Sequence, residues 1–317
     1  MSDGLVIGVP SKGRLKEQVE AWLADCGLDL QPVGGARGYL AALKGAPDVQ
    51  VRLLSAADIA EALDAGDVHL GVTGEDLLRE RGPELDARVL LLRPLGFGGA
   101  DLVVAVPRSW LDVDNMADLE EVAHDHLART GRRMRVATKY LAQTRAFFAR
   151  HGVADYRLAE SGGATEGAPA AGAAELVVDI TTTGATLAAN GLKVLADGVI
   201  LRSQAQLAAG LKADWPPAAL AAAERLLRVV EARAAALRSA TLVWPARGDA
   251  AEQAVVAELV AAGASVRPNG LLVDAADVAR AASALTAAGL GPVTAAQPEF
   301  VFEVSSSAFA NLKAKLF

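Results

Sequence analysis

The chain of 317 residues is longer than one ordinary small domain, so two or three folding units are expected. Its formal net charge of −7, without a block of like charges, argues against nucleic-acid partners, because a nucleic-acid surface needs a basic patch. The single cysteine, Cys26, excludes an internal disulfide framework and a cysteine-based metal site. No signal peptide or membrane-length apolar stretch is visible, so a cytoplasmic protein without membrane contact is expected.

The first hundred residues predict an alternation of strands and helices. The expected elements are a strand over 5–9, a helix ending at Asp25, strands over 48–54 and 68–73 with a helix over 57–65 between them, a helix from Glu75, and a strand over 89–95. Open α/β sheets bind ligands at the carboxyl ends of their strands. Lys12 and Arg14, just after the first strand, are therefore candidates for neutralising phosphate groups, and two solvated loop charges are the alternative. The glycine-rich segment 34–38 is a weak signal by itself.

The turn at Thr73–Asp76 joins a strand to a helix. Acidic residues in the first turn of a helix suit its dipole, and this structural role is one interpretation of Glu75 and Asp76. The same acids would also suit an adenine amino group or a ribose. Thr73, Gly74, Glu75 and Asp76 are therefore candidates for a nucleotide contact.

A second alternating series follows the glycine-rich joint Gly96–Gly99. The expected elements are strands over 102–106, 135–137 and 156–158, helices over 116–128, 143–151 and 168–174, and a strand over 198–206 that returns to the first unit. This pattern predicts an α/β fold of two lobes, with the second lobe inserted in the first. Residues 1–98 and 188–215 are assigned to lobe I, and residues 99–187 to lobe II.

The most informative stretch runs from Leu176 to Leu192. An apolar strand leads into three threonines and Gly184, and a short helix over 185–189 is stopped by Asn190-Gly191. Such a loop directs backbone N–H groups, hydroxyl groups and a helix N-terminus at one point, which suits a phosphate monoester. Asp179 at the strand end is placed to accept hydrogen bonds from sugar hydroxyls, and phosphate beside a diol indicates a phosphoribosyl group. Threonines that only cap the helix are the alternative.

The C-terminal part predicts a linking helix over 216–238 and a separate domain over 239–317. Its expected elements are strands over 241–244, 265–273 and 300–304, helices over 250–262 and 275–288, and a terminal helix. With two strands in the middle segment, the order is β-α-β-β-α-β, that of a ferredoxin-like α+β domain. Such domains often pair edge strands or bind small effectors, but shape alone does not give a function.

Six motifs, in order and across both lobes, resemble ATP phosphoribosyltransferase, the enzyme that opens histidine biosynthesis. They are Ser11–Leu15, Leu70–Leu77, Leu95–Gly99, Arg135–Tyr140, Glu166–Gly172 and Asp179–Leu192. Any one of these motifs alone would be unspecific, whereas the ordered set from Pro10 to about Ala208 is specific.

The resemblance implies two lobes of the type II periplasmic-binding-protein kind, an ACT-like C-terminal domain, dependence on Mg²⁺, and a dimer or hexamer. It implies ATP and phosphoribosyl pyrophosphate as substrates. Glu166 and Arg14 fall where the family has active-site residues, and with Lys12 and Asp179 they form the expected catalytic set. The expected ribose and 5-phosphate contacts are Asp179, Thr181, Thr182, Thr183, Gly184, Ala185, Thr186 and Leu187.

The sequence departs from the family pattern at three places. Asp58-Ile59 is followed by Ala60, where the family often has proline, and residues 173–175 read Ala-Ala-Glu in place of the more usual Gly-Leu-Ala-Asp. The C-terminal extension has the size and element order of the family's histidine-sensing domain, but its sequence is unfamiliar. Histidine is the effector that the resemblance implies for this domain.

The reaction that the resemblance implies is attack of the adenine N1 of ATP on C1 of the phosphoribosyl group. Such a site aligns two anions and stabilises a leaving pyrophosphate, with little proton transfer. Mg²⁺ would take most of its ligands from substrate phosphates and water, so no dense carboxylate cluster is needed. Two alternatives stay open: a salvage phosphoribosyltransferase, which usually has two adjacent acids before the loop, and a non-enzymatic ligand-binding protein.

Overall fold

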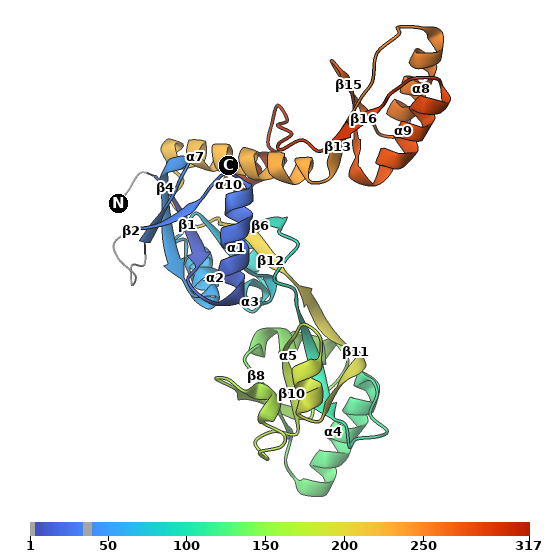
Figure 1. Cartoon of the computed structure of the whole chain (residues 1–317). Helices are drawn as coiled ribbons and strands as arrows, with labels where there is room; N and C mark the ends of the chain where they lie inside the picture. Colours follow the sequence, from blue (N-terminus) through green and yellow to red (C-terminus); the bar gives the residue numbers. More distant parts are fainter. Residues whose placement is uncertain (1–3, 34–39) are drawn as a thin grey trace.

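The computed structural model describes residues 4–33 and 40–317, which form two α/β lobes and a smaller C-terminal domain (Figure 1). The glycine-rich segment 34–38 lies outside the described residues. In the two described ranges, no helix is both long and apolar enough to cross a membrane.

Lobe I is built on a seven-stranded sheet in the order β2-β3-β4-β1-β5-β12-β6. The strands are β1 (Leu5–Pro10), β2 (Leu30–Val33), β3 (Leu40–Leu43), β4 (Ala46–Leu54), β5 (Leu70–Gly74), β6 (Val89–Pro94) and β12 (Ala205–Gly210). β1 lies parallel between β4 and β5, so the carboxyl ends of these three strands meet at one edge. The returning strand β12 runs antiparallel between β5 and β6 and is buried along its whole length.

Helices cover both faces of this sheet. α1 (Gly13–Asp25), the long α7 (Pro217–Ala236) and α10 (Ser307–Leu316) pack on one face, and α2 (Ala56–Ala65) and α3 (Glu75–Arg79) on the other. The approach of α2 to β5 is close enough to require glycine. A Cβ atom at Gly71 would lie 2.7 Å from a side-chain carbon of Ile59.

Lobe II is built on a five-stranded sheet in the order β11-β7-β10-β8-β9. The strands are β7 (Ala100–Pro107), β8 (Met134–Thr138), β9 (Tyr156–Glu160), β10 (Leu176–Thr181) and β11 (Leu192–Ser203). α4 (Met116–Thr130) and α5 (Leu141–Arg150) pack on one face around Phe148, and α6 (Ala185–Ala189) packs on the other through Leu187. β8, β9 and β10 are parallel, so their carboxyl ends share one edge.

Two expectations for lobe II are corrected. The strand expected over 198–206 is two strands, and β11 pairs with β7, so lobe II continues to Ser203 and does not end at residue 187. Gln204 separates them: its side chain accepts the Gly96 N–H at 3.0 Å and its carbonyl accepts the Glu75 N–H at 3.0 Å. The helix expected over 168–174 is a series of turns after a 3₁₀ turn at Thr165–Gly167. Pro169 and Gly172 outweigh the helix preference of the alanines there.

The C-terminal domain has a four-stranded antiparallel sheet in the order β14-β15-β13-β16. Its elements are β13 (Ser239–Val243), α8 (Ala250–Ala261), β14 (Ser265–Arg267), β15 (Gly270–Asp274), a 3₁₀ turn (Ala275–Asp277), α9 (Val278–Ala287) and β16 (Thr294–Ala296). Leu242, Leu259, Leu271 and Leu285 are central to its core. The order is the predicted ferredoxin-like one, although its fourth strand is β16 and not the expected strand over 300–304.

The chain after β16 departs from the expectation. Residues 300–304, the expected last strand, run along α7, where the Val301 N–H donates to the Ala232 carbonyl at 3.0 Å. α10 does not join the C-terminal domain. Its Ala308 and Leu312 are buried in the core of lobe I, and Glu231 of α7 accepts hydrogen bonds from the Ser307 hydroxyl and the Ala308 N–H. The predicted unit 239–317 is therefore divided, because the terminal helix completes lobe I.

Candidate active site

A cavity of about 260 Å³ lies at the carboxyl end of β10. Its lining residues are Ala100, Glu166, Asp179, Ile180, Thr181, Thr182, Thr183, Thr186 and Leu187. Most of the expected phosphoribosyl contacts of lobe II are thus brought together. Gly184 and Ala185 belong to the same loop, which we call the threonine loop (residues 181–186).

The threonine loop is held by its own hydroxyl groups. Thr181 Oγ1 accepts the Gly184 N–H at 2.8 Å, and Thr183 Oγ1 accepts the Ala185 N–H at 3.4 Å. Gly184 has φ of 74°, in the left-handed region that favours glycine, and a Cβ added there would meet no heavy atom within 4 Å. Backbone conformation therefore requires this glycine, whereas packing within the protein does not.

Several backbone donors of this loop remain available. Within the described part of the chain, the N–H groups of Thr182, Thr183, Thr186 and Leu187 have no hydrogen-bond partner. α6 has only five residues, so individual N–H and hydroxyl donors contribute more to anion binding than a helix dipole does. Two threonines cap the turn, and the loop still presents donors to the cavity.

Asp179 is half-buried where β10 meets this loop, and burial raises its pKa above the ordinary value for an aspartate. A hydrogen bond from the Ile180 N–H at 2.8 Å and the positive charge of Lys139 act in the opposite direction, while the Glu166 carboxylate raises the pKa further. Two carboxylates thus face one small cavity. Such a pair can accept hydrogen bonds from vicinal hydroxyl groups.

The lobe I candidates lie apart from the cavity beside Asp179. Lys12 and Arg14 are exposed at the start of α1, directly after the carboxyl end of β1. Thr73 is fully buried and donates its hydroxyl to the Ala56 carbonyl at 2.7 Å. Gly74 pairs with Ala205 in the sheet. The Thr73 hydroxyl is therefore already bonded within the protein, and Gly74, which has no side chain, lies within the sheet, so neither residue offers a polar side-chain group to a nucleotide.

Glu75 and Asp76 have internal partners as well. The Glu75 carboxylate accepts from Gln206 Nε2 at 2.8 Å and from Arg79 Nε at 3.4 Å. Asp76 is 5% exposed, and its two oxygens accept the Tyr140 hydroxyl at 2.6 Å and the Ser203 hydroxyl at 2.8 Å. Because Tyr140 belongs to lobe II, Asp76 joins the lobes in this structure.

Known proteins with similar sequences agree on one family. The family model "HisG: ATP phosphoribosyltransferase" matches residues 55–231. An ATP phosphoribosyltransferase of Caulobacter vibrioides is 67% identical over 307 residues, which are 97% of this chain and 96% of the relative. One of a Bradyrhizobium species is 49% identical and covers 100% of this chain and 99% of the relative. The chain belongs to the ATP phosphoribosyltransferase family.

Family membership confirms the predicted enzyme class, a pentosyl transfer at the first step of histidine biosynthesis, and neither alternative function is supported. A chain of the "ATP phosphoribosyl transferase (HisG:HisZ) complex from Thermotoga maritima" superposes with a TM-score of 0.50 at 24% identity, over 65% of this chain and 87% of that chain. At this identity the likeness shows the fold alone. The predicted pair of periplasmic-binding-protein-like lobes, with a third small antiparallel domain, is confirmed.

For this ATP phosphoribosyltransferase family member, sequence reasoning missed a set of contacts between the lobes. The Glu80 carboxylate of lobe I accepts the N–H groups of Ala142 and Gln143 at the start of α5, at 2.8 and 3.2 Å, and Gln143 Nε2 donates to the Asp76 carbonyl. We call Asp76, Glu80, Tyr140, Gln143 and Ser203 the interlobe joint. Two of these residues gave a signal in the sequence. Asp76 was expected to contact the nucleotide, and Tyr140 ends one family motif without an assigned role.

Proposed function

We propose that the chain transfers the 5-phosphoribosyl group of phosphoribosyl pyrophosphate to N1 of ATP, with the cavity beside Asp179 as the phosphoribosyl site. The observation that carries this proposal is one cavity lined by both the threonine loop and the carboxylates of Asp179 and Glu166. A phosphate needs donors and a ribose diol needs acceptors, and the two kinds of group lie side by side there. The cavity, at about 260 Å³, is below the range of roughly 300–1,000 Å³ for whole-ligand pockets, so it suits the ribose 5-phosphate alone.

In this mechanism the protein positions the two substrates and stabilises the charge that develops between them. The threonine loop would bind the 5-phosphate through the N–H groups of Thr182, Thr183 and Thr186, and the two carboxylates would orient the ribose hydroxyls. Adenine N1 then forms a bond to C1 as the bond from C1 to pyrophosphate breaks, and the electron pair leaves with the pyrophosphate. Positive charge that develops on the ribose ring lies beside Asp179 and Glu166, which stabilise it.

We assign the phosphates outside this cavity to the exposed cations of lobe I. Lys12 and Arg14 follow β1, at the edge where the parallel strands of that lobe end. Glu75 keeps its proposed role on the ATP side, held by Gln206. Thr73, Gly74 and Asp76 act as positioning residues, because their polar groups already bind within the protein.

The residues present fit Mg²⁺ only as an ion shared with substrate. The described residues contain no group of three or more histidine, cysteine, aspartate or glutamate side chains that could hold a metal. Glu166 and Asp179 are the carboxylates of the cavity, and Mg²⁺ is usually bound by one or two carboxylates together with substrate phosphates. These two residues would hold it, and when bound it would neutralise charge on the pyrophosphate.

The assembly as a dimer or hexamer, the response to histidine at the C-terminal domain and the cytoplasmic location stay predictions. Removing the C-terminal domain by truncation near Ala236 would not test the histidine response alone, because it would also remove α10 from the core of lobe I. Variants confined to residues 239–296 are the appropriate test.

The direct test of function is product formation. Incubation of the protein with ATP, phosphoribosyl pyrophosphate and Mg²⁺ should yield phosphoribosyl-ATP and pyrophosphate, identified by mass spectrometry. Hypoxanthine, guanine or orotate in place of ATP should yield no nucleotide. Turnover of a free base without turnover of ATP would refute the proposed function.

A further inference from the structure

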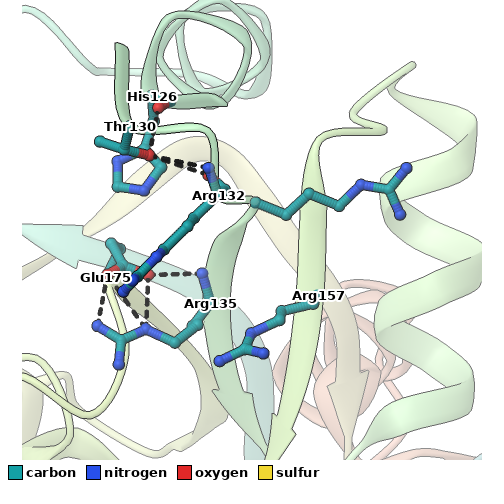
Figure 2. Close-up of a pocket in the computed structure, with 7 residues that line it drawn as sticks. His126, Thr130, Arg132, Arg135, Arg157 and Glu175 are labelled. Carbon is teal, nitrogen blue, oxygen red and sulfur yellow. Dashed lines mark hydrogen bonds and ion pairs between the residues drawn. The ribbon is translucent and has the colours of Figure 1, made fainter. Parts of the chain in front are cut away.

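Figure 2 shows a larger pocket, of about 850 Å³, at another place on lobe II. Its lining residues are His126, Thr130, Arg132, Arg133, Arg135, Arg157 and Glu175, and we call it the basic pocket. Arg135 and Arg157 are the second residues of β8 and β9, and Glu175 directly precedes β10. The basic pocket therefore lies at the amino ends of these parallel strands, whereas the cavity beside Asp179 lies at the carboxyl end of β10.

The basic pocket concentrates positive charge in an acidic protein. Four arginines against one glutamate leave an excess of three positive charges, with His126 neutral, although the formal net charge of the whole chain is −7. The C-terminus of α4 ends beside the pocket and offsets only about half a charge. Most of the positive charge remains for a ligand.

The one carboxylate of the pocket, that of Glu175, is already paired with Arg135. Glu175 accepts hydrogen bonds from Arg135 Nη2 at 2.6 Å, from Arg135 Nε at 3.2 Å and from the Arg135 backbone N–H. Burial acts to raise the pKa of Glu175, but these bonds outweigh it and lower the pKa. Within the described part of the chain, the side chains of Arg132, Arg133 and Arg157 have no ion pair or hydrogen bond.

Strand register forces two of these arginines together. Arg135 and Arg157 are direct partners on the parallel strands β8 and β9, so their side chains leave the same face of the sheet. Like charges placed directly opposite each other are destabilising. Figure 2 shows the guanidinium group of Arg157 directed toward Arg135. A bound anion would offset this repulsion.

We propose that the basic pocket binds a polyphosphate group, either as inorganic polyphosphate or as the phosphate chain of a nucleoside triphosphate. Guanidinium groups bind phosphate oxygens in pairs, and several arginines can share one polyphosphate chain. The volume lies within the range of ligand pockets. Apart from the His126 ring the lining offers no aromatic surface for a base, so the phosphates carry the recognition. This proposal concerns a site separate from the proposed phosphoribosyl site and does not depend on it.

The test is calorimetric titration of the full chain with inorganic triphosphate. The Gly184→Val variant serves as the starting protein, because it removes the competing phosphate site of the threonine loop. This protein should still bind triphosphate, and adding Arg132→Gln with Arg157→Gln should weaken the binding at least about tenfold, since two charge-assisted contacts are lost. Both arginines are exposed, so their replacement leaves the core intact. Circular dichroism checks the fold.

The matched control is Arg129→Gln with Arg145→Gln in the same starting protein. These exposed arginines of α4 and α5 lie outside the basic pocket, and their replacement removes the same charge. Binding should then change less than about twofold, the order expected of screened long-range charges. Titration with ATP identifies the source, because the catalytic ATP site is the same in the starting protein and in the Arg132→Gln, Arg157→Gln variant. If the two replacements weaken ATP binding more than triphosphate binding, the pocket is a nucleotide site, and if they weaken triphosphate binding more, it is an inorganic site. Equal weakening by both double variants, or no triphosphate binding to the starting protein, would overturn the proposal.

Discussion

Two strand–turn–helix units, one in each lobe, have similar local patterns and different roles. β5–α3 and β10–α6 each consist of a strand that begins buried, a strand-to-helix junction with threonine and glycine, and a five-residue helix. Each carries an aspartate near the turn. Asp76 is 5% exposed and bound by Tyr140 and Ser203, whereas Asp179 lines a cavity.

The difference arises from the neighbouring lobe. Tyr140 and the start of α5 pack against α3, so the polar groups of that turn are satisfied within the protein. Among the described residues, the only hydrogen bond from the threonine loop to the glycine-rich joint Gly96–Gly99 is that of the Thr182 hydroxyl to the Gly99 carbonyl, at 3.3 Å. A ligand site is therefore expected where a turn keeps its donors free, whatever the local sequence.

The largest expected effect comes from Gly184→Val. Valine resists the left-handed conformation at this position and places a branched side chain where backbone should approach a phosphate. The variant should fold and lose detectable binding of phosphoribosyl pyrophosphate in calorimetry, while ATP binding changes little. Gly152→Val is the control, because Gly152 also has φ of 74° and open space around it but lies outside the cavity. Equal loss in both variants would attribute the effect to strain alone.

The next effect is that of Asp179→Asn on catalysis. Removing the charge that faces the ribose should cost roughly 1.5–3 kcal/mol, or about 10- to 150-fold in kcat/KM. Because burial raises the pKa of Asp179, kcat/KM of the wild type should fall on acidification at a higher pH than an ordinary aspartate would give. This acid limb should disappear in the variant. Asp112→Asn, at an exposed position of lobe II, should keep wild-type kinetics, and a retained acid limb in Asp179→Asn would assign it to another group.

A substitution in the interlobe joint should lower the free energy of unfolding. Tyr140→Phe removes the donor to a buried carboxylate and should lower the free energy of unfolding by about 1–3 kcal/mol in urea denaturation. Tyr156→Phe is the control, since the Tyr156 hydroxyl has no hydrogen-bond partner among the described residues. If the two variants lose equal stability, the bond to Asp76 contributes nothing specific.

The smallest expected effect is that of Asp179→Asn on the thermal stability of the protein. Burial raises the pKa of Asp179 in the folded state, so the folded protein holds this proton more tightly than the unfolded chain. Ionisation therefore costs stability as the pH rises from the ordinary aspartate pKa through the raised one. At neutral pH the asparagine variant should melt no lower than the wild type, while Asp76→Asn should melt lower because a buried acceptor becomes a donor. A lower melting temperature for Asp179→Asn would contradict this contrast.

Local signals in the sequence predicted much of the fold and the residues of lobe II that gather at the candidate site. The helix Ala185–Ala189 and the strand before it lie where the apolar run, Gly184 and Asn190-Gly191 indicate. Such signals depend on the conformational preferences of a few neighbouring residues, and these preferences are the same whatever the segment packs against. The ordered family motifs also identified the family correctly.

Tertiary structure alone decided which acid stays free and which element belongs to which lobe. Asp76 and Asp179 cannot be told apart without knowing that Tyr140 reaches α3. α10 leaves its own domain because its apolar face completes the core beside α7, and β11 joins lobe II because it pairs with β7. The neighbouring positions of Arg135 and Arg157 follow from strand register. These facts depend on contacts between residues distant in sequence, for which a local pattern carries no information.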